Sequence, residues 1–284
     1  MVDIKDYHSD FENKWCPGCG NFNILEAMKD ALVNLGLVPE KVLIVSGIGQ
    51  AAKTPHFLKC NFFHGLHGRA LPVATGAKIA NHDLTILVNS GDGDAYGEGG
   101  NHFMNAVRRN IDITLLVHNN KVYGLTKGQA SPTSDMGFTT RMQWQGVISE
   151  PFNPLAVALA LGAGFVARGF SGDVESLSAI IQEGVSYRGF SLIDILQPCV
   201  SFNTVNTHAW YKKRVKHLAR TGYAPDDLEK ALKVARQWGD EIPTGVIYKR
   251  EGVSFTDRIP RLDSGPLISG TFNPEAVVSL ISQI

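Results

Sequence analysis

Residues 84–120 read LTILVNSGDGDAYGEGGNHFMNAVRRNIDITLLVHNN, and the pattern within them indicates the class of fold. The stretch starts and ends with short apolar runs, residues 84–88 and 113–117, and residues 99–109 between them have helical spacing. Short apolar runs of this kind are typical of strands buried in a parallel sheet. A strand, a helix and a second strand form a βαβ unit, which places two parallel strands side by side. The stretch therefore predicts that the polar residues following each strand meet at one edge of a sheet.

The same alternation of strands and helices continues on both sides of this unit. It predicts an α/β fold with a doubly wound parallel sheet over residues 1–200, followed by a C-terminal extension over 201–284. Within the extension we expect a basic helix near residues 209–220, a second helix near 225–238, and otherwise irregular chain. Residues 121–150 have little periodicity, and their aromatic residues favour an ordered loop. The other expected elements are helices at residues 22–35, 72–80, 154–162 and 173–187, and strands at 42–46, 165–167 and 190–196.

The composition excludes several classes of protein. The 284 residues carry 27 lysines and arginines against 27 acidic residues, whereas nucleic-acid-binding proteins usually have a basic excess. A hydrophobic fraction of 44% is too high for a disordered chain, and no apolar run approaches the ~20 residues of a membrane helix. The polar residues 1–8 lack a signal-peptide core, and four cysteines are too few for a disulfide scaffold. We therefore expect a cytoplasmic protein that binds neither nucleic acid nor a membrane.

The carboxyl ends of the expected strands carry a candidate diphosphate site, because ligands of such sheets bind there. A hard divalent cation prefers oxygen ligands, and Asp92 offers a carboxylate, Asn120 an amide oxygen and Val122 a backbone carbonyl. The glycines around Asp92 allow a phosphate to approach the backbone closely. Gly-Asp-Gly alone is an ordinary turn. Together with the Asn-Asn pair one βαβ step later, it resembles the motif with which thiamine-diphosphate enzymes hold magnesium and, through it, the cofactor.

The segment Trp15-Cys16-Pro-Gly-Cys19 has three interpretations. A thioredoxin-like dithiol is disfavoured, because no strand is expected before the motif and its Pro-Gly order is reversed. A Cys-x-x-Cys pair also suits a tetrahedral zinc ion. An iron–sulfur cluster needs four thiolates, so every cysteine would have to serve: Cys16, Cys19, Cys60 and Cys199. The residues alone leave the zinc and cluster interpretations equally open.

Several motifs taken together resemble one family, the β subunits of 2-oxoacid:ferredoxin oxidoreductases. The resemblance is highly specific and extends from about residue 14 to residue 220, and the residues beyond match less distinctively. The motifs are Trp15-Cys-Pro-Gly-Cys-Gly20, Gly47-Ile-Gly49, His67-Gly-Arg-Ala-Leu-Pro-Val-Ala-Thr-Gly76, Gly91-Asp-Gly-Asp94, Gly99-Gly-Asn-His102, Asn119-Asn-Lys-Val-Tyr-Gly-Leu-Thr-Lys-Gly-Gln-Ala-Ser-Pro-Thr133 and Gln197-Pro-Cys199.

This resemblance implies that the chain binds thiamine diphosphate, magnesium and one 4Fe-4S cluster. Cys16, Cys19 and Cys199 match three of the family's cluster ligands. Many family members carry the remaining cysteine directly after Gly-Ile-Gly, where this chain has Gln50. We expect the loop of residues 51–59 to fold back and deliver Cys60 as the fourth ligand, and the alternative is an altered cluster.

The activity implied by the resemblance is the oxidative decarboxylation of a 2-oxoacid. Coenzyme A would accept the acyl group, electrons would pass through the cluster to ferredoxin, and the reaction could also run in reverse. Because the chain has only one cofactor domain, a separate α subunit is expected to supply the carboxylate that activates thiamine. The cysteines favour this activity over a non-oxidative thiamine-diphosphate decarboxylase or carboligase subunit, and over a zinc or scaffold protein.

Several residues near the expected site are candidates for catalysis or binding. His67 is expected to contact cofactor or substrate, unless it only braces its loop, and Leu125 is expected to line the pocket. Lys53 could hold the distal carboxylate of a substrate, which slightly favours 2-oxoglutarate over pyruvate. The basic residues in 212–220 could dock ferredoxin, although a solvated helix face is the simpler interpretation. The expected cofactor-binding residues are Gly49, His67, Gly91, Asp92, Gly93, Asp94, Asn120, Val122, Gly124, Leu125 and Thr126.

Overall fold

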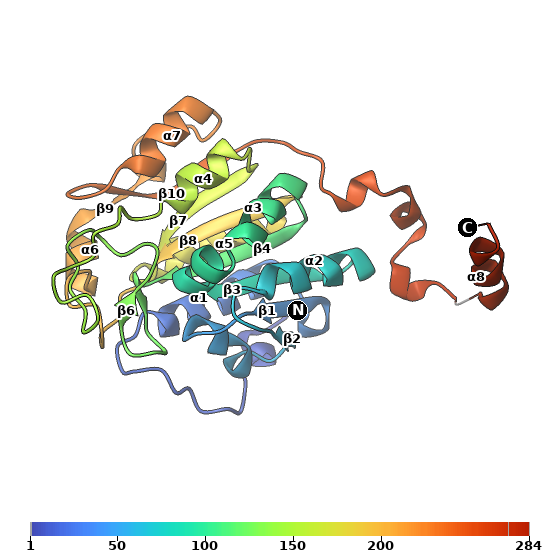
Figure 1. The fold of residues 1–284 in the computed structure, drawn as a ribbon, viewed down its shortest axis with the longest axis horizontal. Coiled ribbons are helices and arrows are strands. Elements are labelled where there is room, and N and C mark those ends of the chain that lie inside the picture. Colours follow the sequence, from blue (N-terminus) through green and yellow to red (C-terminus); the bar gives the residue numbers. More distant parts are fainter. Residues whose placement is uncertain (1, 272, 284) are drawn as a thin grey trace.

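The computed structural model describes residues 2–271 and 273–283, and an eight-stranded sheet lies at its centre (Figure 1). Its strands are β1 (Val42–Ser46), β2 (Asn61–His64), β3 (Thr85–Gly91), β4 (Ile113–Asn119), β7 (Phe165–Phe170), β8 (Phe190–Leu196), β9 (Val215–His217) and β10 (Ile242–Lys249). They lie in the order β2-β1-β3-β4-β8-β7-β10-β9. Each neighbouring pair is parallel except β7 and β10. The predicted α/β fold with a parallel sheet is thus confirmed.

Helices cover both faces of this sheet. One layer consists of α1 (Asn21–Asn34) and α5 (Val174–Ser186), and the other of α2 (Ala70–Ala80), α3 (Gly100–Arg109), α4 (Pro154–Ala160) and α7 (Leu228–Arg236). Successive strand residues alternate between the layers, so that Leu87 packs beneath α1 whereas Ile86 and Val88 pack beneath α2 and α3. Because both faces are covered, the strands read in sequence as continuous apolar runs.

The expected basic helix over residues 209–220 is wrong in its second half. Helix α6 spans only His208–Arg214, where the Arg214 guanidinium stacks 4.3 Å from the centre of the Trp210 ring. Residues 215–217 instead form β9, which pairs with β10, and a short 3-10 turn follows. Pairing with a neighbouring strand therefore overrides the local helical preference of this segment.

The expectation of irregular chain after residue 238 is also wrong, because β10 joins the main sheet beside β7. Its opening residues, Ile242-Pro-Thr-Gly, interrupt the apolar pattern that would mark a strand, and its register shifts between Val246 and Tyr248. Strand β2 was missed for a different reason. All of its residues are exposed at the edge of the sheet, so no burial pattern is present in the sequence.

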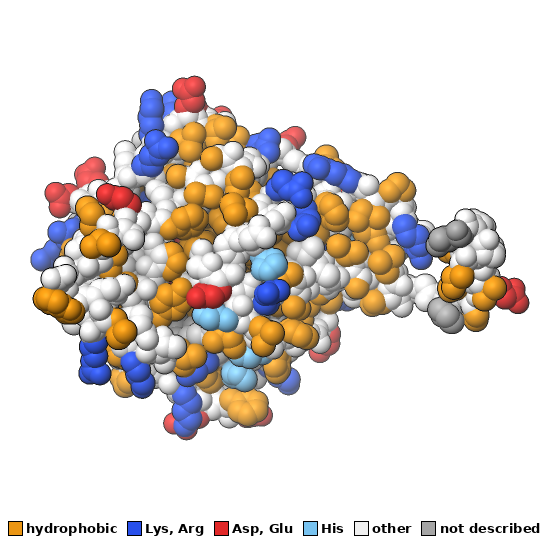
Figure 2. Space-filling view, viewed as in Figure 1, with side chains coloured by type: hydrophobic (Ala, Val, Ile, Leu, Met, Phe, Trp, Pro, Cys, Tyr) orange, Lys and Arg blue, Asp and Glu red, His pale blue; other side chains and the backbone are white. Residues whose placement is uncertain are grey.

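Beyond β10 the chain first stays on the body of the molecule: the Phe255 N–H donates to the Asn110 carbonyl, Arg188 pairs with Asp257, and Leu262 is buried. The described residues after Leu262 lead to helix α8 (Pro274–Ile281), at the right of Figure 1. Figure 2 shows apolar side chains along the segment that leads to α8. Among the described residues, no helix combines the length and the hydrophobicity that crossing a membrane requires. Among the described residues after Leu262, the exposed large apolar side chains are Leu267, Ile268, Val277, Val278, Leu280 and Ile281.

The packing of α3 against the sheet gives a first testable prediction. Phe103 is fully buried, and its ring centre lies 5.3 Å from that of Tyr96 and 6.2 Å from that of Phe190. We expect Phe103→Ala to lower the free energy of unfolding by about 3–5 kcal/mol, because the lost ring leaves a cavity. Urea denaturation followed by circular dichroism measures the change. Met104→Ala is the matched control at an exposed position, with an expected change below about 0.5 kcal/mol. Equal losses in both variants would contradict this packing.

Candidate functional site

One cavity lies at the carboxyl ends of β1, β3 and β4. It is also lined by Ile48, Gln50, Ala51 and Tyr123. Lys53 does not line it and lies half-buried in the 3-10 helix Ala51–Phe57. The structure brings together in this cavity the complete set of expected cofactor-binding residues: Gly49, His67, Gly91, Asp92, Gly93, Asp94, Asn120, Val122, Gly124, Leu125 and Thr126.

Asp92 follows β3 and is 1% exposed. Its Oδ2 accepts hydrogen bonds from Ser131 Oγ and Thr133 Oγ1, both at 2.5 Å. Burial raises the pKa of the Asp92 carboxyl, and the two hydroxyls oppose that rise by stabilising the charged form. Ser131 and Thr133 were part of the motif noted in the sequence, but spacing alone could not show that the loop returns to Asp92.

Asn120 and the residues after it shape the opposite wall of the cavity. The Asn120 side-chain oxygen accepts the Val122 backbone N–H at 3.0 Å, in a turn where Lys121 has a φ of 62°. An amide oxygen has two lone pairs, so one remains available to a ligand. A Cβ added at Gly93 would overlap the Tyr123 ring, whereas one added at Gly91 would meet nothing within 4 Å. Gly93 is therefore required for packing, and the backbone at Gly91 borders open space.

Asp94 holds three loops together. It lies in a π-helical turn, Gly93–Glu98, and is 2% exposed. Its carboxylate accepts the backbone N–H groups of Ile48 at 3.1 Å and Gly68 at 2.7 Å, and the Ser90 hydroxyl at 2.5 Å. The loops that follow β1, β2 and β3 thus converge on one carboxylate. π-helical turns of this kind occur frequently at functional sites.

His67 lines the cavity and also braces its loop. Its Nδ1 lies 2.6 Å from Asp94 Oδ1 and its Nε2 lies 3.3 Å from Glu98 Oε2. The Glu98 carboxylate accepts a further hydrogen bond from the Tyr123 hydroxyl at 3.2 Å. Both ring nitrogens of His67 are therefore oriented by carboxylates. Glu98 and Tyr123 belong to this group and were not predicted from the sequence as site residues.

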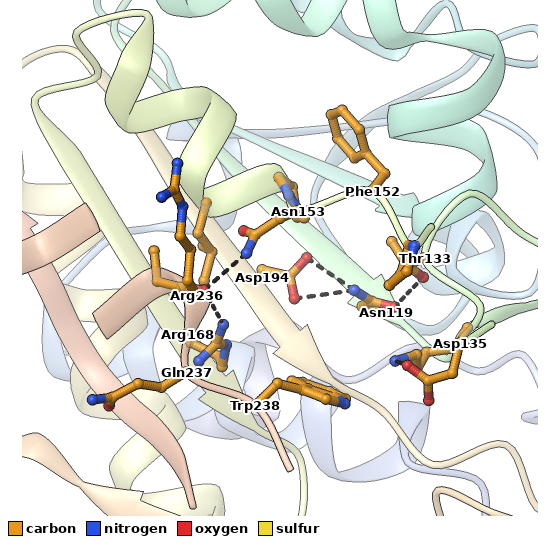
Figure 3. Close-up of a pocket in the computed structure, with 15 residues that line it drawn as sticks. Asn119, Thr133, Asp135, Phe152, Asn153, Arg168, Asp194, Arg236, Gln237 and Trp238 are labelled. Carbon is orange, nitrogen blue, oxygen red and sulfur yellow. Dashed lines mark hydrogen bonds and ion pairs between the residues drawn. The ribbon is translucent and has the colours of Figure 1, made fainter. Parts of the chain in front are cut away.

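A second buried hydrogen-bond network is joined to Asp92 through the Thr133 hydroxyl. Figure 3 shows Asn119 between Thr133 and Asp194: its Oδ1 accepts from the Thr133 hydroxyl at 2.9 Å and its Nδ2 donates to both Asp194 oxygens at 3.2 Å. Asp194 also accepts from the Tyr96 hydroxyl at 2.8 Å. The buried Arg168 nearby donates to the backbone carbonyls of Ala235, in the last turn of α7, and Pro243, in β10. Arg168 and Asp194 are charged residues within the apolar strands β7 and β8, and this signal is visible in the sequence. Their hydrogen-bond partners could not be predicted, because they depend on the fold.

Three of the four cysteines line an adjacent cavity. Cys16, Cys19 and Cys199 lie around it, and Gln50, Asn120 and Gly124 line both this cavity and the first one. Burial, together with the neighbouring thiols, raises the pKa of Cys19 to about 11. A thiol of this kind becomes a thiolate when a metal binds it. In the part of the chain that the structure describes, no three His, Cys, Asp or Glu side chains are grouped closely enough to hold a single metal ion.

The expectation that Cys60 joins these cysteines is wrong. Strand β2 is parallel to β1, and Asn61 pairs with Leu43 near the start of β1. After β1 the chain must therefore return to the amino ends of the strands before β2 can begin, and residues 51–59 make this return. Cys60 lies at that end, where its Sγ donates to the Asn61 carbonyl at 3.3 Å and burial raises its pKa to about 12. The other cysteines lie beyond the opposite ends of the strands.

Comparisons with known proteins agree with this geometry. Residues 45–195 match the family model "Thiamine pyrophosphate enzyme, C-terminal TPP binding domain", and residues 199–264 match the model for the C-terminal part of the pyruvate ferredoxin oxidoreductase beta subunit. The 2-oxoacid:ferredoxin oxidoreductase subunit beta of Saccharolobus solfataricus is 46% identical over 254 residues, which are 85% of this chain and 83% of that relative. The chain belongs to the 2-oxoacid:ferredoxin oxidoreductase β-subunit family.

Two further similar proteins are named for 2-oxoglutarate. The 2-oxoglutarate oxidoreductase subunit KorB of Mycobacterium tuberculosis is 45% identical over 199 residues, which are 70% of this chain and 53% of that protein. The solved 2-oxoglutarate:ferredoxin oxidoreductase of Magnetococcus marinus, with 2-oxoglutarate, coenzyme A and succinyl-CoA bound, superposes with a TM-score of 0.91 at 34% identity and covers 98% of this chain and 96% of its own. The expected family and oxidoreductase function are confirmed.

The buried Asp194 gives a prediction on pH dependence. Burial raises the pKa of Asp194 to about 6 from its ordinary 3.8. Between these values the folded protein keeps a proton that the unfolded chain releases, so this group's stabilising contribution falls as the pH rises. Relative to Asp194→Asn, we expect the wild-type free energy of unfolding to fall by about 1.4 kcal/mol per pH unit between about pH 4 and pH 6. Urea titrations across this range measure the difference, and parallel pH curves would contradict it.

Proposed function

We propose that this chain holds thiamine diphosphate and magnesium in a 2-oxoacid:ferredoxin oxidoreductase that acts on 2-oxoglutarate. The observation that carries the proposal is the single cavity into which the whole expected set of residues converges. The Asp92 carboxylate, the free lone pair of the Asn120 amide oxygen and the Val122 carbonyl form an oxygen donor set that fits magnesium. Added Cβ atoms at Gly49 and Gly91 would meet nothing within 4 Å, which fits a backbone cradle for a diphosphate.

Bound thiamine diphosphate would supply the chemistry that cleaves the bond between the keto carbon and the carboxylate of the substrate. The chain's own residues would position the reactants. His67, fixed by Asp94 and Glu98, would present an oriented imidazole edge to the cavity, and Leu125 and Thr126 would cover its mouth. The adjacent cysteine cavity supports electron transfer out of the site through an iron–sulfur cluster to ferredoxin.

The choice of 2-oxoglutarate rests on the relatives. The Magnetococcus marinus enzyme binds 2-oxoglutarate, and several KorB relatives are named for that substrate, whereas the Saccharolobus solfataricus relative is named for 2-oxoacids in general. Lys53 gives no support from this chain, because it does not line the cavity. No lysine or arginine of the described residues lines the cavity, so we expect the group that binds the distal carboxylate on another chain.

We further propose that this cavity is covered by an α subunit, which supplies the carboxylate that activates thiamine. Leu125, which lines the cavity, is 41% exposed. The loop that follows Ser131 and Thr133, the hydroxyl partners of Asp92, exposes Met142 (77%), Trp144 (74%) and Ile148 (91%). Exposed apolar groups gathered beside a cofactor site are typical of an interface with another chain. The four free cysteines are consistent with a reducing cytoplasmic setting.

The test of this function uses the chain co-purified anaerobically with its α partner. We expect methyl viologen reduction that depends on coenzyme A and is faster with 2-oxoglutarate than with pyruvate. A panel of 2-oxoacids, each assayed with and without coenzyme A, measures this. Consumption of the 2-oxoacid without viologen reduction would instead indicate a non-oxidative decarboxylase or carboligase, and faster turnover of pyruvate would contradict the substrate assignment alone.

The proposed magnesium site predicts that stability and binding respond in opposite ways to one substitution. Asp92→Asn removes a buried charge at nearly constant shape, so the thermal stability of the unliganded protein should stay equal or rise. The affinity for thiamine diphosphate in the presence of magnesium should fall at least tenfold, because the only carboxylate of the donor set is lost. Calorimetric titration of the αβ enzyme measures the affinity. Asp240→Asn, at a fully exposed carboxylate, is the control, and an unchanged affinity in Asp92→Asn would contradict the assignment.

A further inference from the structure

Gln50 lies between the two cavities of the site. It follows the Gly47-Ile-Gly turn at the carboxyl end of β1 and lines the diphosphate cavity together with Asp92. It also lines the cavity that contains Cys16, Cys19 and Cys199. Its backbone carbonyl accepts the Trp15 indole N–H at 2.8 Å, which fixes the loop, whereas its side-chain amide makes no hydrogen bond to another described residue. The side chain is therefore free to face a group held by the cysteines.

The number of thiols at this site does not match a complete set of cluster ligands. A 4Fe-4S cluster with full cysteine ligation needs four thiolates. The chain has four cysteines, but Cys60 lies at the amino ends of the strands, and only three thiols line the cavity. No rotamer of the Cys60 side chain can bring its thiol to the cavity, because the parallel pairing of β2 with β1 places Cys60 at the opposite edge of the sheet, where the strands begin.

We propose that the iron–sulfur cluster of this chain is held by three cysteines, Cys16, Cys19 and Cys199, and that its fourth iron faces Gln50 without a thiolate ligand. This inference rests on the proposed function, in which the chain carries a cluster. An amide or solvent oxygen is a harder donor than a thiolate and binds the iron of such a cluster more weakly. The fourth iron is therefore the labile one, and it lies on the side of the cluster that faces the diphosphate cavity.

Two consequences follow for a cluster with this ligand set. Replacing one thiolate by a neutral oxygen donor makes the cluster less negative by one charge, which raises its reduction potential. It also opens the cluster to loss of one iron on oxidation. When ferricyanide removes one electron from a cluster of two ferric and two ferrous ions, the products are a three-iron cluster with three ferric ions and one released ferrous ion.

The experiment compares the wild-type αβ enzyme, Gln50→Cys and Cys60→Ser, all purified anaerobically. Gln50→Cys keeps the bond from Trp15, which uses the backbone carbonyl, and supplies the missing thiolate. Cys60→Ser keeps a hydroxyl that can donate to the Asn61 carbonyl. Each enzyme is treated with one equivalent of ferricyanide per cluster. Ferrous iron is measured with a chelating dye, and the three-iron cluster is measured by electron paramagnetic resonance.

We expect the wild type and Cys60→Ser to release about one iron per cluster and to show the three-iron signal, and Gln50→Cys to release at least tenfold less. Gln50→Cys should also have a lower reduction potential in a redox titration. Loss of the cluster in Cys60→Ser, or equal retention of four irons in the wild type and Gln50→Cys, would overturn the inference while leaving the viologen assay of the proposed function intact. Absence of iron and sulfide from all three enzymes would overturn both.

Discussion

The parallel direction of β1, β2, β3, β4 and β8 is the constraint on which the rest of the structure depends. Parallel neighbours cannot be joined by a tight turn, so the chain must cross back over the sheet after each strand. Each crossing leaves the loop after a strand at the same edge, where the diphosphate cavity and the cysteine cavity are assembled. The same constraint sends Cys60 to the other edge. The parallel direction of the strands therefore brings the loops of the site together and keeps Cys60 away from the other three cysteines.

The second requirement of the site is to keep three carboxylates buried close together. Asp92, Asp94 and Asp194 are each at most 3% exposed, and none of them contacts a lysine or an arginine among the described residues. Hydroxyl and N–H donors stabilise them, and the nearby Arg168 charge lowers the pKa of Asp194, but burial is the largest effect and raises the pKa of both Asp92 and Asp194. In the proposed function, a bound divalent cation would supply a positive charge beside the Asp92 carboxylate.

The sequence predicted the features that follow from the order of strands and helices. It did not predict the features that depend on how a loop or a distant segment folds back onto the sheet. Asp92 and Asn120 could be brought together because one βαβ step separates them. The partnership of Ser131 and Thr133 with Asp92 could not be predicted, because it depends on how an irregular loop folds back. Strand β10 escaped detection because its proline and glycine break the alternation, and its pairing with β7 is decided by a distant segment. The chain has four cysteines, which suggested that Cys60 is a cluster ligand, and the parallel direction of β1 and β2 excluded it.

The two cavities share Gln50, Asn120 and Gly124, and this sharing makes their ligands interdependent. Asn120 contributes a possible metal ligand on one side, and its backbone carbonyl accepts Asn203 Nδ2 at 3.2 Å in the segment that follows Cys199. A change in the cysteine loops therefore acts directly on the turn that presents the Asn120 amide. Gly124 adjoins the Gln50 side chain, since a Cβ added at Gly124 would lie in ordinary van der Waals contact with Gln50 Cγ, at 3.7 Å. In the proposed function, electron transfer and cofactor binding would thus be connected by a few residues of the loops after β1 and β4, rather than by a long path through the protein.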